Sequence, residues 1–248
     1  MGKEDRLRAV TETSGPIQCA CLIHGTMYGW EYVDRLYNML TRNLSQGIQL
    51  HVYTEAERQV PSHMIKHELR DLKVSGPRKG WWYKLQLFNH KHYQGPMLYF
   101  DLDTVITDNI DWITHQSLDY FWAPRDFKRL WRPSHTGINS SVMWWDTRKF
   151  DDVWQKFREQ DFGMTQRRYP GDQDFLSEVI TEDRRRFLDE RLIRSWKWEC
   201  LDGGWDFRRR AHFNPNTGTR LDGAGVLVFH GKPNPSEVQD PVVLQHWR

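Results

Sequence analysis

The 248-residue sequence has no uninterrupted apolar run near the ~18 residues that a membrane-spanning helix needs. Its first fifteen residues also lack the apolar segment of a secretory signal peptide. It contains only three cysteines, which is too few for a disulfide framework. We therefore expect a cytoplasmic protein whose cysteines, including Cys19 and Cys21 on one predicted strand, are buried reduced thiols rather than metal ligands.

The sequence also lacks an excess of charge of either sign. It has 35 Lys and Arg against 33 Asp and Glu, a net charge of +2. Because nucleic-acid-binding domains are usually strongly basic, we expect no nucleic-acid partner. The cluster Arg208–Arg210 leaves peripheral membrane association open. The sequence is rich in tryptophan, with thirteen, and 38% hydrophobic residues exclude a disordered chain.

The length fits one large domain, and we find no linker, so residues 17–248 should form a single domain after a loose polar lead-in at 1–16. Residues 17–25 form a short apolar run that ends in glycine, as a buried strand would. Residues 28–43 carry apolar side chains at helical spacing, and 48–55 read as a second strand. A strand–helix–strand start predicts a parallel sheet with helices on its faces.

Farther along, Trp81–Tyr93 has helical spacing, and a continuous apolar run from Met97 predicts a buried central strand. The remaining predictions are strands at 119–123, 140–145 and 225–233, helices at 149–160 and 171–182, and an extended tail containing Pro233, Pro235 and Pro241.

Two aspartates, Asp101 and Asp103, stand where the predicted central strand ends. Residues two apart in an extended segment face the same way, so the carboxylates would repel each other unless a cation lies between them. Hard divalent cations prefer oxygen ligands, and functional groups of open α/β sheets gather at the carboxyl ends of strands. The pattern favours a metal site.

Four further segments carry polar groups that could be functional or structural. His230–Pro233 follows an apolar strand and is either a ligand turn or a surface turn. Gly171–Asp174 opens a predicted helix and is either a hydroxyl-binding site or a helix cap. Gly137–Ser141 fits a turn entering a strand, and a lysine such as Lys84 is usually solvated.

In this order, the segments resemble the GT-A glycosyltransferases, particularly glycosyltransferase family 8, which includes the glycogenins and bacterial lipopolysaccharide glycosyltransferases. The resemblance covers about residues 17–233 and includes IQCACLIHGTMYG, the lysine of WWYKLQLF, YFDLDTVITDNI, GINSSVMWWD, GDQDFLS and FHGKP. The chain departs from the family at Ser141, where glycine is usual, and in a contracted last motif, where His230 and Lys232 are only two apart. The implied fold is α/β of the Rossmann-like GT-A type, a mixed, mostly parallel sheet flanked by helices.

The resemblance implies metal-dependent transfer of a sugar, with retention, from a nucleotide diphosphate sugar, UDP-sugar first, to a glycan or other acceptor. Asp172 is a better candidate nucleophile than the amide of Gln173, but we favour same-face displacement in which the leaving diphosphate takes the acceptor's proton. A nitrogen ligand beside two carboxylates favours Mn²⁺ over Mg²⁺. The implied roles are metal binding by Asp101, Asp103 and His230; phosphate or donor-sugar contacts by Lys84, Gly231 and Lys232; base and ribose contacts by His24, Gly25 and Tyr28; and donor-sugar contacts by Asn139, Asp172 and Gln173.

Two other functions fit parts of the sequence. YFDLDTV also matches the opening motif of haloacid-dehalogenase-type phosphatases, in which Asp101 would be the nucleophile. Against this reading, Leu176 occupies the position where that family's later motif needs an acid. A non-catalytic nucleotide-sugar-binding relic of the GT-A fold is the second alternative. In either transferase or relic, Trp196, Trp198 or Trp205 could stack on an acceptor sugar or simply pack in the core.

Overall fold

A computed structural model describes residues 15–72, 79–201, 205–206, 211–212 and 218–248, and the structural statements below concern these residues. The predicted lead-in therefore lies almost wholly outside the described residues, as do Arg208–Arg210 and the side chain of Trp205. No described helix is both long and apolar enough to cross a bilayer.

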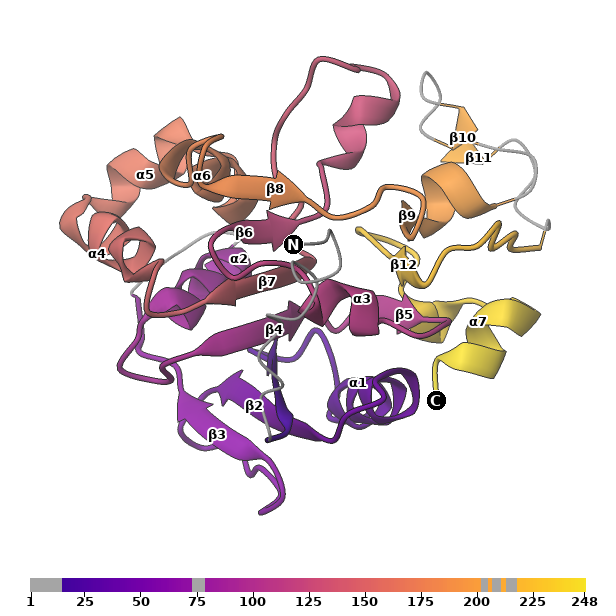
Figure 1. Ribbon diagram of the computed structural model, residues 1–248, viewed down its shortest axis with the longest axis horizontal. Helices are drawn as coiled ribbons and strands as arrows, with labels where there is room; N and C mark the ends of the chain where they lie inside the picture. Colours follow the sequence, from indigo (N-terminus) through magenta and orange to yellow (C-terminus); the bar gives the residue numbers. More distant parts are fainter. Residues whose placement is uncertain (1–14, 73–78, 202–204, 207–210, 213–217) are drawn as a thin grey trace, which may run out of the picture.

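The main element is a seven-stranded sheet with the order β3-β2-β1-β4-β7-β6-β8 (Figure 1). Neighbouring strands are parallel except where β7 pairs with β4 and with β6. The predicted mixed, mostly parallel sheet is confirmed. The strands are β1 Ile17–Leu22, β2 Ile48–Thr54, β3 Ile65–Glu68, β4 Pro96–Phe100, β6 Phe121–Ala123, β7 Val142–Asp146 and β8 Arg185–Phe187.

Helices cover both faces of this sheet, which explains why β1, β2 and β4 are apolar almost throughout. One hydrophobic core packs α1 and a smaller sheet against one face of the large sheet. The other packs η2, α4 and α6 against the opposite face of the large sheet. The helices are α1 Glu31–Asn43, α2 Lys79–Trp82, α3 Asp111–Thr114, α4 Asp151–Glu159, α5 Phe162–Arg168, α6 Asp172–Val179, α7 Pro241–His246, the 3₁₀ helices η2 Tyr83–Phe88, η3 Phe127–Leu130 and η5 Pro235–Glu237, and the π-helix η4 Trp196–Cys200.

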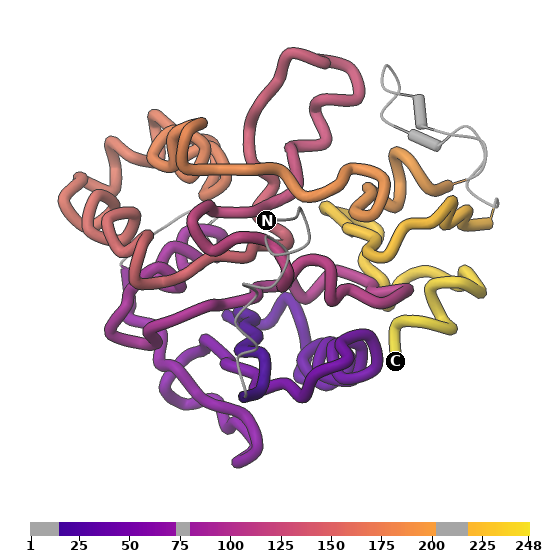
Figure 2. The backbone as a smooth tube through the Cα atoms, viewed as in Figure 1, coloured from indigo at the N-terminus to yellow at the C-terminus, as the bar shows by residue number. Residues whose placement is uncertain are grey.

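The smaller sheet has the order β5-β12-β9, with β5 at Thr104–Ile106, β9 at Ile193–Ser195 and β12 at Val226–Val228. The chain passes from β4 of the large sheet to β5 of the small one through Asp101–Asp103. The backbone tube in Figure 2 shows the small sheet and the C-terminal segment on the same side of the molecule. A third sheet pairs β10, Trp205–Asp206, with β11, Ala211–His212. The predicted central strand therefore ends between two sheets.

The structure corrects several element predictions. The helix expected over Trp81–Tyr93 is instead the short helix α2 followed by η2, which ends at Phe88. The tail is not wholly extended, because Asp240 accepts hydrogen bonds from the backbone N–H groups of Val242 and Val243 and starts α7 with Pro241 at its first position. The expectation of buried thiols is confirmed, since all three cysteines are free and buried.

Candidate functional site

Lys84 lies at the centre of a buried group of charges. It belongs to η2, and its Nζ atom lies 2.8 Å from Asp101 Oδ1 and 3.6 Å from Asp172 Oδ2. The same ammonium donates to the hydroxyl of Ser140 at 3.1 Å. Burial alone would lower the pKa of Lys84, but Asp101 and Asp172 outweigh it and hold the pKa above its ordinary value. The lysine is therefore a charged, buried group that links two predicted site residues, rather than a solvated one.

Asp101 and Asp103 share the turn between β4 and β5. Tyr99 donates to Asp101 Oδ1 at 2.6 Å, and Tyr28 donates to Asp103 Oδ2 at 3.3 Å. Burial and then the neighbouring charge of Asp101 raise the pKa of Asp103 to about 7, although Lys84 acts in the opposite direction. The second negative charge of this pair is therefore poorly compensated by the chain itself, as expected where a cation is to be bound.

His230 adjoins this turn from the small sheet. The backbone N–H of Phe229 donates to the carbonyl oxygen of Asp103 at 3.0 Å, which places His230 next to the backbone of the turn that carries the two carboxylates. The ring of His230 stacks on Phe127, and its Nε2 atom lies 2.6 Å from the hydroxyl oxygen of Ser195. Burial and then Lys197 lower the pKa of His230 to about 3. The imidazole is thus neutral, which is the form that binds metal ions.

The structure does not bring the side chain of Lys232 to this site. Lys232 is 73% exposed, and its ammonium pairs with Glu237. Instead, the buried Lys197 reaches the turn, where its Nζ atom donates to the carbonyl oxygen of Lys232 at 3.0 Å. Gly231 has a φ of +72°, and a Cβ atom there would lie 3.7 Å from the Lys197 ammonium. The contracted motif therefore places a different lysine next to His230.

Glu55, just after β2, fixes the backbone of the loop that follows β1. The backbone N–H of Gly25 donates to Glu55, and the guanidinium of Arg58 donates to the carbonyl oxygen of Gly25 at 2.7 Å. Burial would raise the pKa of Glu55, but the hydrogen bonds that its carboxylate accepts from the backbone N–H of Gly25 and from Arg58 and Thr54 lower it to about 2. His24 stacks on Tyr83 with ring centroids 4.1 Å apart. These contacts give the predicted nucleotide-binding loop a fixed backbone.

The predicted donor-sugar residues lie on the other side of Lys84. Ser140 donates to Asp172 Oδ2 at 2.7 Å, and burial raises the pKa of Asp172. Asn139 uses its side-chain oxygen to accept the backbone N–H of Ser141, so it shapes the turn before β7. Gln173 points elsewhere: its amide nitrogen donates to Asp126 at 3.5 Å.

Sequence reasoning missed several residues of this arrangement. The sequence carries no motif for Asp126, Ser195 or Lys197, because contacts between distant elements define them. Tyr99 could have been found, since it lies on β4 two residues before Asp101, where residues of an extended segment face the same way.

The carboxylates and the imidazole suit a divalent cation chemically. Oxygen donors from Asp101 and Asp103 and a neutral nitrogen donor fit Mn²⁺ or Mg²⁺. Within the described part of the chain, no three side chains of His, Cys, Asp or Glu already stand in metal-binding geometry. Lys84 on Asp101 and Ser195 on His230 occupy atoms that a cation would use. The donor set fits, and binding requires these side chains to turn.

The fold is that of the GT-A glycosyltransferases. No family model and no curated protein matches the sequence. Among solved structures, the glycosyltransferase GlyE of Streptococcus pneumoniae TIGR4 matches with a TM-score of 0.66 and 14% identity over 94% of this chain. This chain spans 61% of the length of GlyE. The galactosyltransferase LgtC, in complex with donor and acceptor sugar analogs, gives a TM-score of 0.56 and 13% identity over 90% of both chains. The bifunctional glycosyltransferase WbbM matches with a TM-score of 0.59 and 10% identity, over 90% of this chain and 47% of the WbbM chain. The expected fold is confirmed.

Proposed function

We propose that the protein is a metal-dependent glycosyltransferase that moves a sugar from a nucleotide diphosphate sugar, with UDP-sugar as the first candidate, to an acceptor hydroxyl with retention. The observation that carries the proposal is the meeting of Asp101 and Asp103 with the strand end that bears His230, joined by the hydrogen bond from Phe229 to Asp103. The glycosyltransferase fold of the chain supports the same reaction class.

Asp101, Asp103 and His230 would hold the cation. When bound, it would neutralise the donor diphosphate and stabilise it as a leaving group. Lys197 adds a buried positive charge at the same turn, and its contact with the backbone of Lys232 fixes its position. We assign the diphosphate contact to Lys197 rather than to Lys232, whose charge is used by Glu237 on the surface.

Asp172 and Gln173 take different roles in this proposal. The Oδ2 atom of Asp172 accepts from Ser140 and lies near Lys84, so this carboxylate is held for hydrogen bonding rather than freed for attack. The amide of Gln173 reaches Asp126 on the loop after β6 and can orient a sugar hydroxyl. This arrangement supports same-face displacement, in which the acceptor oxygen bonds to the anomeric carbon while the leaving diphosphate takes its proton. Most of the acceleration then comes from positioning and electrostatics.

The direct experiment is a thermal-shift series with UDP and GDP, each with and without Mn²⁺. A ligand that binds only the folded state raises its apparent stability. We expect a shift that requires both one nucleoside diphosphate and the metal, and loss of that shift in Asp103→Ala. Asp119→Ala, which removes an exposed carboxylate, is the matched control.

Replacing Asp103 by alanine should also abolish donor turnover while the far-ultraviolet circular dichroism stays unchanged. An active Asp103→Ala protein that still responds to Mn²⁺ would refute the metal assignment. Mn²⁺-dependent hydrolysis of a UDP-sugar without acceptor would separate a transferase from a relic that only binds the donor.

The phosphatase alternative is weakened by the contacts of Asp101. Tyr99 and Lys84 both engage the carboxylate that would have to attack phosphorus. Steady hydrolysis of p-nitrophenyl phosphate that is lost in Asp101→Asn would reinstate the phosphatase reading.

A further inference from the structure

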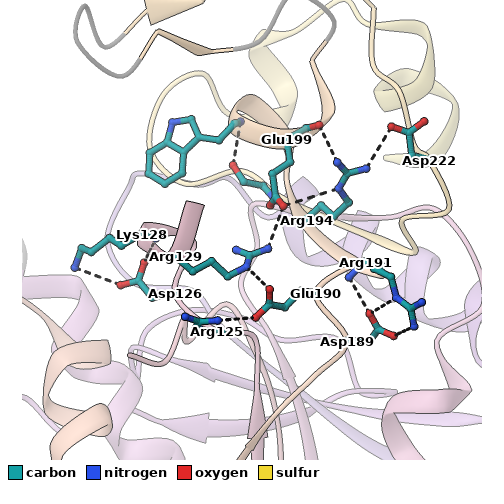
Figure 3. A network of polar contacts seen from close by, with 12 residues as sticks. Arg125, Asp126, Lys128, Arg129, Asp189, Glu190, Arg191, Arg194, Glu199 and Asp222 are labelled. Carbon is teal, nitrogen blue, oxygen red and sulfur yellow. Dashed lines mark hydrogen bonds and ion pairs between the residues drawn. The ribbon is translucent and has the colours of Figure 1, made fainter. Parts of the chain in front are cut away.

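A cavity lies outside the group of charges around Lys84, and its lining includes Arg194 and Glu199 from β9 and η4. Its volume is about 660 Å³, which is within the range of about 300–1,000 Å³ typical of small-molecule sites. The residues that line it come from the loop after β6 with η3, the segment joining β8 to β9, β9 itself, η4 and the turn before β12, and Figure 3 shows most of the charged ones. The polar lining consists chiefly of Arg125, Arg129, Glu190, Arg194, Glu199 and Asp222.

These six side chains form one chain of alternating charge. Glu190 lies between Arg125, at 3.5 Å, and Arg129, at 2.8 Å. Arg129 also reaches Glu199 at 3.0 Å. Arg194 continues the chain: its Nε atom lies 4.0 Å from Glu199, and its Nη1 atom lies 3.5 Å from Asp222. Dashed lines in Figure 3 follow the sequence of contacts. Three guanidinium groups are thus matched by three carboxylates, and the fourth arginine that lines the cavity, Arg191, pairs with Asp189 at 2.6 Å.

This balance determines which ligands suit the cavity. A phosphate or carboxylate would compete with the chain's own carboxylates for these arginines, because Nη1 of Arg129, which has no hydrogen-bond partner in the described part of the chain, is buried. A sugar hydroxyl both donates and accepts hydrogen bonds, so neighbouring hydroxyls can accept from an arginine and donate to the next carboxylate without breaking the ion pairs. The alternating pattern therefore matches a neutral polyhydroxyl compound rather than an anion.

We propose that this cavity is the acceptor site and that it takes a neutral oligosaccharide. The proposal rests on the proposed glycosyltransferase function, which it extends to the class of acceptor. The assignment uses no residue of the metal-binding turn.

The cavity is preorganised and is tied to His230. The side chain of Arg129 is 6% exposed and that of Glu199 is 11% exposed, so neither loses much freedom when a ligand binds. Glu199 accepts the backbone N–H of Ser195 at 2.8 Å, and the hydroxyl of Ser195 meets His230 at 2.6 Å. One residue, Ser195, therefore joins the wall of the cavity to the candidate metal ligand, and a bound acceptor would lie next to the donor.

An apolar surface borders the polar chain. Leu130 lines the cavity and is 37% exposed, and the next residue, Trp131, is 42% exposed. The ring centroids of Trp131 and Trp198 are 4.9 Å apart, and those of Trp198 and His230 are 4.0 Å apart. Exposed aromatic faces suit the apolar faces of sugar rings. The surface thus extends the polar chain toward His230 and gives the site room for more than one sugar unit.

The test compares Glu190→Gln with Glu178→Gln in the intact protein. The two glutamates are matched, because both side chains are about half exposed and both pair with an arginine. Glu178, however, lies on α6, pairs with Arg168 and does not line the cavity. Binding of maltose, lactose and cellobiose is measured by isothermal titration calorimetry and saturation-transfer NMR, without donor. We expect at least one of these disaccharides to bind, with a Kd that rises about tenfold or more in Glu190→Gln and stays unchanged in Glu178→Gln.

Asp222→Asn provides a second variant at the other end of the chain and should weaken the same sugar. Glucose 1-phosphate and mannose 6-phosphate serve as anionic probes. Binding of these phosphates but not of neutral sugars would overturn the proposal, as would equal affinity in Glu190→Gln and Glu178→Gln, or no binding by any of the three disaccharides. The thermal shift with UDP and Mn²⁺ should be unchanged in Glu190→Gln. A protein that binds the disaccharide but not UDP with Mn²⁺ would refute the proposed donor and spare the sugar site.

Discussion

At the scale of single residues, the departure of this chain in its last motif has a structural counterpart. His230 and Lys232 are only two apart, and the lysine that follows the glycine points to Glu237 on the surface. A buried lysine from η4 reaches the same turn from another part of the sequence. The motif alone predicts the position of the histidine but not which lysine lies beside it.

This difference predicts unequal effects of two matched substitutions. Lys197→Met should weaken UDP binding in the presence of Mn²⁺ by about tenfold or more, because it removes a buried charge near the diphosphate. Lys232→Met should leave the affinity unchanged, since that ammonium pairs with Glu237. Titration calorimetry of both variants measures the difference. Equal losses in the two proteins would contradict the assignment.

At the scale of elements, the sequence predicted β1, β2 and β4 from their continuous apolar runs, and α1 from apolar residues at helical spacing. The edge strand β3 was missed, since Ile65–Glu68 is short and mostly exposed. The helical spacing after Trp81 was real, but it belongs to a tight 3₁₀ segment whose six side chains are all buried. The start of α7 was readable from Asp240 followed by Pro241, a capping signal that the prolines of the tail obscured.

A pair of buried histidines, His51 on β2 and His67 on β3, predicts that the protein loses stability in acid. His51 Nδ1 and His67 Nε2 are 2.7 Å apart, and burial lowers the pKa of His51 to about 4 and that of His67 to about 3. Above the unfolded pKa, near 6.5, both states are neutral; below it, the unfolded chain binds protons that the folded chain does not. Stability should therefore fall as the pH drops from about 6.5 to 4, by up to about 1.4 kcal/mol per pH unit for each histidine.

Urea unfolding at pH 7, 6 and 5 measures this slope. His67→Gln should flatten it, whereas His115→Gln, at an exposed position outside the sheet, should leave it as in the parent protein. A slope that is identical in all three proteins would rule out the histidine pair as its source.

At the scale of the whole molecule, the C-terminal segment closes one of the two cores. Trp247 is 4% exposed, its ring meets Tyr32 of α1 at 5.0 Å, and the guanidinium of Arg35 lies 4.1 Å from the centre of its ring. Residues from the beginning and the end of the domain thus pack on each other. This long-range packing could not be predicted from local periodicity, because it depends on where α7 returns to α1.

Trp247→Ala should therefore lower the free energy of unfolding by about 3–5 kcal/mol, through lost burial and the cavity left behind. Trp81→Ala, at a site that is 49% exposed, is the comparison and should cost much less. Denaturant titration of both variants gives the values. A cost at Trp247 as small as that at Trp81 would show that the segment is not part of the core.

The passage of the chain from β4 to β5 has a mechanical consequence. Asp101 is anchored to the large sheet through its backbone N–H bond to Ser141, whereas the carbonyl oxygen of Asp103 is anchored to the small sheet through Phe229. The two carboxylates are therefore positioned by different sheets, Asp101 by the large sheet and Asp103 by the small one. The distance between them depends on how the two sheets pack together, and the ion pair of Arg129 on η3, after β6, with Glu199 on η4, after β9, ties the two sheets to each other.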